Sequence, residues 1–324
     1  MSERIESVDI LRGIAVLQMV FFQAFDFFAR ANIYSDSPYF IQSMSMPVNG
    51  IGVGLFAFIT GVGVYLSIRK GISSGSGRLT VFRRVLRRYG SYILISLFFT
   101  SFVFGFGIFY SWNEALQGIG LSALVAALLL LSFQNIYVIA ALGVLISFLQ
   151  PYARTLIEQN MASFPHLMFV FNAMLLGFFS LATILPLTLF GIFLGFQIVM
   201  FGRDVAVKKS FCIGVILTLT ALLMHASGFR IDYYGRSPSL MVFFSGISFL
   251  SFSLVEFFIG GRVQNSRGIL PVFGRRALFC YLFHFVFIYK PLVYLGIEST
   301  FGALPSILLA ALSVYVIYLI AARL

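Results

Sequence analysis

Polar and ionisable side chains interrupt the long apolar runs of this sequence at a few places, and these residues could carry chemistry. The first apolar run, residues 8–30, contains Gln23 and Asp26, and a later run, 277–296, contains His284. Polar groups inside a membrane are costly and therefore mark candidate functional positions. His284 is the residue of the expected spans whose reference pKa lies near neutrality, so it could take a proton from an attacking hydroxyl or amine. A structural role is the alternative, because a histidine on an aromatic helix often hydrogen-bonds a neighbouring carbonyl group.

Helix rise allows the depth of these residues to be compared. At about 1.5 Å per residue, Asp26 lies about 21 Å beyond Arg12, and Lys290 lies about 21 Å beyond Arg276. If the two helices touch, Asp26 and Lys290 could form an ion pair in which each charge offsets the desolvation of the other. Such a pair could serve function or only fix the packing of the helices, and both interpretations stay open.

Arginines gather between the second and third apolar runs, in the stretch RKGISSGSGRLTVFRRVLRRYG, which contains no acidic residue. Within FRRVLRR, Arg83 and Arg87 fall on one helical face, with Arg84 and Arg88 beside them. Guanidinium groups hold phosphates in bidentate fashion, so the cluster could bind a phosphate-rich ligand. Orientation of the chain and contact with anionic lipid are the alternative roles, and the sequence supports both interpretations equally.

The composition determines which elements must position these residues. The 324 residues are 60% hydrophobic and only 10% charged, whereas soluble domains contain about 25% charged residues. Disorder is excluded because far too much apolar surface would face water. We therefore expect an all-α, polytopic integral membrane protein with residues 1–324 in a single domain. The ten predicted spans are, to within a few residues, 8–30, 48–68, 91–110, 117–133, 136–150, 181–201, 211–226, 239–259, 277–296 and 303–322.

The distribution of basic residues predicts the orientation of the chain. The positive-inside rule places the basic stretch between the second and third runs in the cytoplasm, and the other connections alternate. With both termini cytoplasmic, seventeen of the 22 Lys and Arg residues lie on the cytoplasmic side. The net charge of +11 is thus explained without nucleic-acid binding, which we do not expect. Residues 151–180 predict an interfacial or re-entrant segment on the outer side of a cytoplasmic or plasma membrane.

Other sequence signatures of metal, nucleotide or transport sites give little further information on the function. Cys212 and Cys280 lie inside expected spans without the spacing of metal ligands, so we expect no metal centre. The sequence contains neither a Walker loop nor a dinucleotide-binding fingerprint. A carrier or flippase, with Asp26 and Lys290 as a gate, is the second functional interpretation, although no internal repeat typical of transporters is evident.

Several stretches, in order along nearly the whole chain, resemble the transmembrane acyltransferase superfamily. That superfamily includes the acyltransferase-3 proteins and the heparan-α-glucosaminide N-acetyltransferase-like proteins. The opening RIESVDILRGIAVLQMVFFQAF resembles its first helix, where an acid precedes Leu-Arg-Gly, here Asp9, Leu11, Arg12 and Gly13. Later helices of the superfamily are similar to LFAFITGVGVYLSIRKG, EALQGIGLSALVAALLL and ILPLTLFGIFLG, and its histidine-containing segment is similar to FGRRALFCYLFHFVFIYKP.

The resemblance implies an enzyme that takes an acyl group, typically acetyl, from acyl-coenzyme A (acetyl-CoA or another acyl-CoA) on the cytoplasmic side. A sugar, glycan or amine at the membrane or outer side is the implied acceptor, and membrane lipids and a second copy of the chain are compatible partners. His284 takes the place of the catalytic base, with Gln23 as an orienting or oxyanion group and Asp26 as its partner. The residues implied to face the phosphates of the coenzyme are Arg12, Arg83, Arg84, Arg87, Arg88, Arg275 and Arg276.

One departure from the superfamily concerns the base. Many acyltransferase-3 members carry a histidine where this sequence has Gln23, and the heparan-type enzymes place a catalytic histidine in the connection after the first helix. Residues 31–47 contain no histidine, and a glutamine cannot act as a base at neutral pH. Either His284 or Asp26 therefore supplies the base, or the protein is a non-catalytic member of the same fold.

Overall fold

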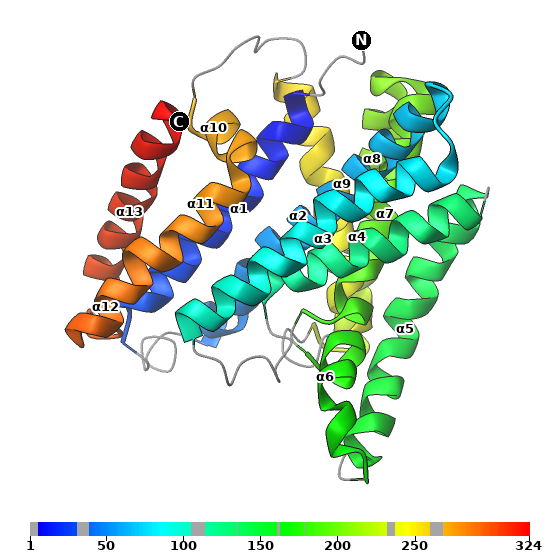
Figure 1. Cartoon of the computed structure of the whole chain (residues 1–324). Helices are drawn as coiled ribbons and strands as arrows, with labels where there is room; N and C mark the ends of the chain where they lie inside the picture. The colour runs from blue at the N-terminus through cyan, green and yellow to red at the C-terminus, as the bar shows by residue number, and fades with distance from the viewer. Residues whose placement is uncertain are drawn as a thin grey trace. The chain divides into compact units, whose positions relative to one another are not determined.

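The regular elements of the protein are helices (Figure 1). The computed structural model describes residues 6–30, 39–104 (backbone only for 39–49), 114–133, 135–160, 163–177, 179–231, 237–259 and 268–324. Within these ranges the α-helices are α1 (Glu6–Phe28), α2 (Tyr39–Ser73), α3 (Arg78–Phe104), α4 (Ala115–Ser132), α5 (Ile136–Asn160), α6 (Met168–Phe171), α7 (Leu181–Phe201), α8 (Arg203–Ala226), α9 (Pro238–Ile259), α10 (Ile269–Arg275), α11 (Ala277–His284), α12 (Lys290–Leu295) and α13 (Ala303–Arg323). A 3₁₀ turn, η3 (Pro165–Leu167), and two π-helical segments, η4 (Asn172–Leu176) and η5 (Phe285–Tyr289), complete the set.

The described residues contain nine helical segments long and apolar enough to cross a membrane. They coincide with nine of the ten predicted spans. The remaining prediction, residues 91–110, falls on α3, which is helical up to Phe104, where the described range ends. The expected all-α polytopic membrane protein is therefore confirmed. The orientation of the termini stays a prediction.

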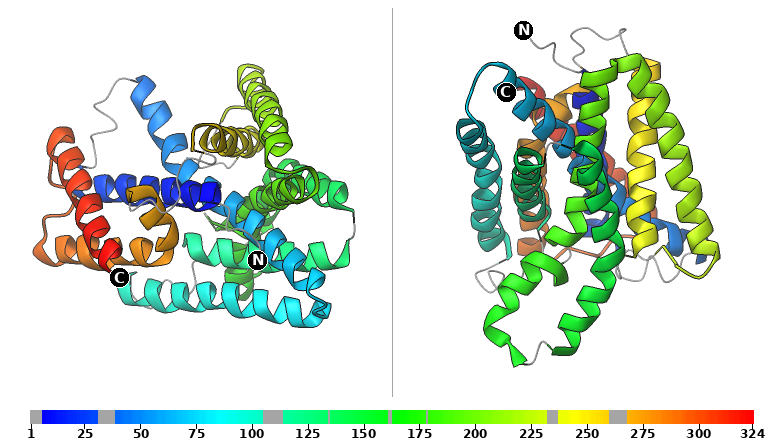
Figure 2. Two further views of the ribbon diagram at one scale, coloured as in Figure 1. Left: turned by 90° about the horizontal axis from the view of Figure 1, so that it is seen from above. Right: turned by 90° about the vertical axis from the view of Figure 1, so that its right-hand side faces the viewer.

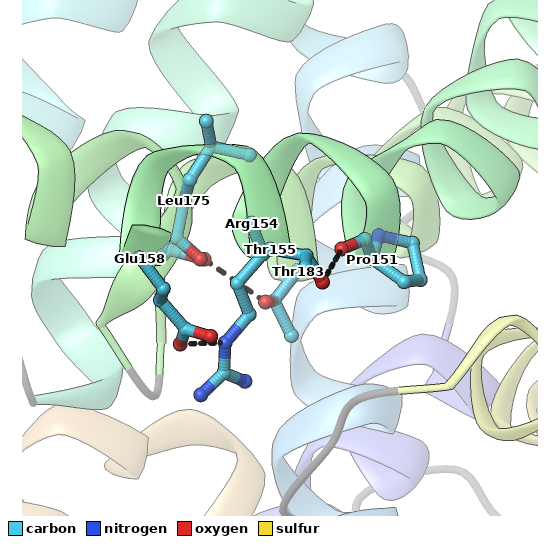
Figure 3. A network of polar contacts seen from close by, with 7 residues as sticks. Pro151, Arg154, Thr155, Glu158, Leu175 and Thr183 are labelled. Atoms are coloured by element: carbon cyan, nitrogen blue, oxygen red, sulfur yellow. Dashed lines mark hydrogen bonds and ion pairs between the residues drawn. The ribbon is translucent and has the colours of Figure 1, made fainter. Parts of the chain in front are cut away.

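The segment predicted as interfacial or re-entrant is built mainly as helix (Figure 3). α5 continues through Pro151, since Thr155 donates a hydrogen bond to the Pro151 carbonyl (3.0 Å) and Arg154 pairs with Glu158 (2.7 Å). The interrupted helix formed by α6 and η4 then returns, with η4 packed on α5 and α7. The Ser180 hydroxyl, 3.2 Å from the Leu175 carbonyl, links this segment to the start of α7. The stretch is thus a helical extension of its neighbours.

Contacts divide the chain into two compact units, and each is described by itself. The first unit consists of the described residues within Ala57–Leu254. In it α7 packs against α4, α5 and α8, and α3 packs against α4 (Figure 2). The second unit consists of Glu3–Phe56 and Val255–Leu324, and in it α1 packs against α10, α11 and α13. This division leaves the single domain expected over residues 1–324 a prediction.

Helix α3 shows how the first unit positions its basic residues. Val81, Val85 and Tyr89, spaced four residues apart, are buried in a core with side chains of α2, α4, α5 and α7. Residues at this spacing share one helix face, so the arginines between them must point the other way. The apolar periodicity of the helix alone therefore sets the direction of the basic cluster.

Candidate functional site

Two predicted site residues meet in the second unit. Gln23, in the last third of α1, and His284, the last residue of α11, are joined by a hydrogen bond of 2.8 Å between Gln23 Oε1 and His284 Nε2. His284 is 0% exposed, and Gln23 is half-buried. The structure thus brings together an amide and an imidazole that lie 261 positions apart in the chain.

Aromatic rings surround the imidazole of His284. Phe27 stacks on it with ring centroids 6.1 Å apart, and the rings of Tyr281 and Phe285 lie at 5.4 Å and 4.2 Å. Phe27 in turn contacts Tyr289 at 4.6 Å. These rings shield the imidazole from water on several sides, and Gln23 is the polar side chain in hydrogen-bond contact with it.

The amide of Gln23 controls which imidazole nitrogen can accept a proton. When Oε1 faces Nε2, the contact is a hydrogen bond in the tautomer whose Nε2 carries the proton and whose Nδ1 carries the lone pair. Nδ1 is buried and makes no hydrogen bond of regular geometry to the described residues, although the carbonyl groups of Tyr281 and Cys280 lie a helical turn before it. Turning the amide by half a rotation reverses the roles, because its NH₂ group then donates to Nε2. Gln23 is therefore placed to set the tautomer of His284.

The helix changes its geometry directly after His284. Residues Phe285–Tyr289 form the π-helical segment η5, and α12 follows at Lys290. A single π-helical turn inside an α-helix is rare and occurs frequently at functional sites. The sequence analysis gave no indication of this change, because the hydropathy of residues 277–296 does not distinguish a π-helical turn from an α-helical one.

The predicted ion pair between Asp26 and Lys290 is wrong. The structure describes both residues and shows no ion pair between them, with Asp26 exposed and Lys290 half-buried. The same depth along two helices does not ensure contact, because the rotation of each helix about its axis also decides which side chains meet. Asp26 makes no recorded hydrogen bond to His284 either, so its role as a catalytic partner stays a prediction.

Arg12 lies at the opposite end of α1 from Gln23. Its Nη1 atom is 2.8 Å from Asp9 Oδ1, one turn earlier. Here α1 touches α10 backbone to backbone: a Cβ atom on Gly13 would be 2.0 Å from the Leu270 carbonyl oxygen, and one on Gly274 would be 1.8 Å from that of Asp9.

This close approach brings together two basic motifs of the second unit. Gly13 directly follows Arg12, and Gly274 directly precedes Arg275 and Arg276, both of which are exposed. α10 ends at Arg275, beside the start of α1 (Figure 1). Three predicted phosphate-binding residues therefore gather at one end of this unit. The adjacent glycine in each motif was the signal for the contact.

The other basic cluster lies on α3 in the first unit. Its four central arginines are exposed, as their helical spacing predicts, and these are Arg83, Arg84, Arg87 and Arg88. Arg84 Nη2 lies 3.4 Å from Ser76 Oγ, and the guanidinium of Arg88 lies 5.4 Å from the centroid of the Tyr89 ring. The helical face is confirmed, and the binding of phosphate by this face stays a prediction.

The first unit also contains a buried carboxylate that the sequence reasoning missed. Glu114, the N-cap residue of α4, accepts hydrogen bonds from Leu116 N (2.8 Å) and from Ser96 Oγ on α3. The available signal was the spacing of Glu114 and Gln117 before an apolar run, which resembles a capping box. Within the described residues no group of three or more His, Cys, Asp or Glu side chains could hold a metal ion.

Comparison with known families adds an independent finding. The sequence profile described as heparan-α-glucosaminide N-acetyltransferase, catalytic, matches residues 4–198. The match takes in Arg12, Gln23, the basic cluster of α3 and Glu114, and it ends before His284. Comparison with curated proteins gave no match. Because the profile covers more than half of the chain, the protein belongs to the heparan-α-glucosaminide N-acetyltransferase catalytic family.

Proposed function

We propose that this membrane acetyltransferase-like protein transfers an acetyl group from acetyl-CoA, or a related acyl group from its acyl-CoA, to a sugar, glycan or amine acceptor. Family membership supports acetyl transfer. The hydrogen bond between Gln23 and His284 carries the assignment of the site, because it holds a buried imidazole beside an amide that can turn. The other two histidines, His166 and His225, are exposed.

The proposed reaction needs one base. The acceptor hydroxyl or amine gives its proton to His284 while its oxygen or nitrogen attacks the thioester carbonyl carbon. The carbon–sulfur bond then breaks, and the leaving thiolate takes the proton back, so the products are free coenzyme A and an acetylated acceptor. When the Gln23 amide is turned so that its NH₂ group donates to Nε2, that nitrogen holds the lone pair, and the acceptor displaces the amide to reach it. The freed amide N–H group can then stabilise the oxyanion of the tetrahedral intermediate.

The phosphates of the coenzyme are proposed to bind exposed arginines. Guanidinium groups suit phosphate because each presents several N–H donors in one plane. The candidates are the residues at the start of α1 and the end of α10 in the second unit (Arg12, Arg275 and Arg276), and the α3 cluster in the first (Arg83, Arg84, Arg87 and Arg88). Each set is exposed on its own unit apart from Arg12, which is half-buried.

The decisive experiment is acetyl transfer by the full chain, purified and reconstituted in lipid nanodiscs. Acetyl-CoA is supplied with glucosamine, a disaccharide or a simple amine, and free thiol is measured. We expect thiol release that depends on the acceptor. The exposed Cys212 contributes a constant background of one thiol per protein, which is subtracted.

Two outcomes would contradict the proposal. If acetyl-CoA neither binds nor releases thiol with any acceptor, the protein is a non-catalytic member of the family. If instead vesicles containing the protein take up a solute and Asp26→Asn alters that uptake, the carrier interpretation replaces the enzyme.

The α3 arginines provide a prediction on the donor side. Exchange of Arg83, Arg84, Arg87 and Arg88 for glutamine is expected to raise the KM for acetyl-CoA about tenfold or more, with little change in kcat. The salt dependence of KM should also weaken, because fewer charges are left to screen.

A matched control for this prediction lies in the same unit. Lys208 and Lys209, exposed at the start of α8, are changed to glutamine together. This pair is expected to leave KM unchanged. An equal KM for acetyl-CoA in wild type and in the α3 variant would contradict binding of the donor by α3. Exchange of Arg275 and Arg276 for glutamine would then test the arginines of the second unit.

A further inference from the structure

The four side chains around the imidazole of His284 differ in their exposure. Tyr281 and Phe285 belong to the same helical run as His284 and are buried, at 4% and 6% exposed. Gln23 and Phe27 come from α1 and are half-buried. Because these two residues lie four positions apart, they share one face of the helix. Of the four side chains, Gln23 and Phe27 are therefore those that a molecule approaching from outside meets first.

The ring of Phe27 lies against the imidazole. The two rings are nearly parallel, with an interplanar angle of 15° and centroids 6.1 Å apart. The same ring contacts Tyr289 and Phe285, with centroids 4.6 Å and 5.6 Å away. Phe27 thus connects α1 to η5 beside the imidazole, and His284 is 0% exposed under this arrangement.

The main chain of Phe27 is held in place by the connection between α12 and α13. The Phe27 carbonyl oxygen accepts a hydrogen bond from Ser299 N (2.9 Å), and the Phe28 carbonyl accepts one from Phe301 N (2.9 Å). Arg30 N donates back to the Phe301 carbonyl (3.0 Å). Ser299 has a φ of 54°, a costly conformation for a residue other than glycine, which the surrounding contacts must maintain. The end of α1 is therefore anchored, and the part of Phe27 that is able to move is its side chain.

A half-buried ring on an anchored backbone moves by changing its rotamer. Long and aromatic side chains in α-helices use two χ1 values, near 180° and near −60°. Exchange between rotamers takes picoseconds to nanoseconds for exposed side chains. In its other rotamer the Phe27 ring leaves the imidazole, and of the two α1 side chains only the Gln23 amide then stands before Nε2.

We infer that the side chain of Phe27 is the gate of the His284 site and sets the size of the acceptor that reaches the imidazole. With the ring against the imidazole the site is closed, and when the ring turns away the acceptor enters beside Gln23. A closed site also excludes water, which would compete with the acceptor. The assignment of an acceptor to this gate rests on the proposed function, whereas the closure can be measured without it.

The experiment measures access to the imidazole in the absence of any substrate. Diethyl pyrocarbonate transfers its ethoxycarbonyl group to a neutral imidazole nitrogen, so the rate of this reaction reports the exposure of His284. The full chain carrying His166→Gln and His225→Gln, in which His284 is the single remaining histidine, is purified in lipid nanodiscs. Mass spectrometry follows the modified peptide. Phe27→Ala should speed the modification about tenfold or more, because a minor open state is typically populated at about 10% or less.

Two further variants separate a gate from general loosening of the helices. Phe21→Ala is the matched control, because Phe21 is also half-buried on α1 but lies two positions from Gln23, on the opposite side of the helix. Its ring contacts Phe22 at 5.5 Å, and its removal should leave the modification rate unchanged. Phe27→Leu keeps an apolar side chain and removes the flat ring. It should raise the rate even if Phe27→Ala folds poorly.

Acceptor size gives a second readout, which depends on acetyl transfer. In Phe27→Ala the KM for a disaccharide acceptor should fall further than the KM for glucosamine, with little change in kcat. If Phe27→Ala exposes His284 but no form of the protein releases thiol from acetyl-CoA, the proposed function fails and the gate stands.

Two results would overturn the gate. One is a wild-type chain in which His284 reacts with diethyl pyrocarbonate as fast as the exposed His166 does. The other is a modification rate that is the same with and without the Phe27 ring, or that rises equally in Phe27→Ala and Phe21→Ala. In that case the ring of Phe27 only packs against the imidazole, even if the protein transfers acetyl groups.

Discussion

Replacement of His284 by alanine is expected to reduce the rate of acetyl transfer by about a hundredfold to ten-thousandfold, the contribution typical of a positioned general base. The imidazole is fully buried against Phe27, Tyr281 and Phe285, and its Nε2 atom contacts Gln23. No other buried histidine can replace it. The rate is measured as thiol release from acetyl-CoA with saturating acceptor, and acetyl-CoA binding should persist in the variant.

Three further variants separate chemistry from packing. His284→Gln fills most of the same space and can bond Gln23, but it cannot accept a proton at neutral pH, so it should be as inactive as the alanine variant. Gln23→Leu should lower the rate and change its pH profile, because the tautomer of the imidazole is no longer set. His166→Ala, at an exposed position, should be fully active. If His284→Gln retained wild-type activity, the imidazole would be a packing group and Asp26 the next candidate base.

Replacement of Gly274 by alanine is expected to destabilise the protein by about 3 kcal/mol or more, at or beyond the upper end for overpacking. The added Cβ would lie 1.8 Å from the carbonyl oxygen of Asp9, which is backbone rather than a flexible side chain. α1 and α10 can then accommodate it only by moving apart. Gly13→Ala creates the reciprocal clash with Leu270, at 2.0 Å, and should behave alike.

The measurement is the yield of monodisperse protein and its thermal unfolding midpoint in detergent. Gly90→Ala serves as the matched control, since a Cβ there meets only Leu86 Cδ1, at 3.8 Å. Gly90 lies inside α3, so alanine at this position should be neutral or stabilising by up to about 1 kcal/mol. A Gly274→Ala protein as stable as the Gly90→Ala protein would contradict the close packing of α1 on α10.

Local sequence patterns were sufficient to predict part of the candidate site. The exposed arginines of α3 follow from the buried spacing of Val81, Val85 and Tyr89, because the period of a helix decides its faces without help from the rest of the chain. The rise of a helix also placed Asp26 and Lys290 at similar depth, each about 21 Å beyond the arginine at the start of its run. The same arithmetic failed to predict whether Asp26 and Lys290 meet, because it contains no information on rotation about the helix axis.

The sequence by itself determined that this protein is an all-helical membrane protein and that the arginines of α3 share an exposed side of their helix. Apolar length and helical period are properties of neighbouring residues, so they can be read along the chain. The tertiary structure decided that Gln23 meets His284, that Gly13 and Gly274 bring two arginine motifs together, and that Ser96 meets the buried carboxylate of Glu114. Each of these contacts depends on how one helix is rotated against another, or on a break such as that between α10 and α11, and the packing of residues distant in sequence determines both.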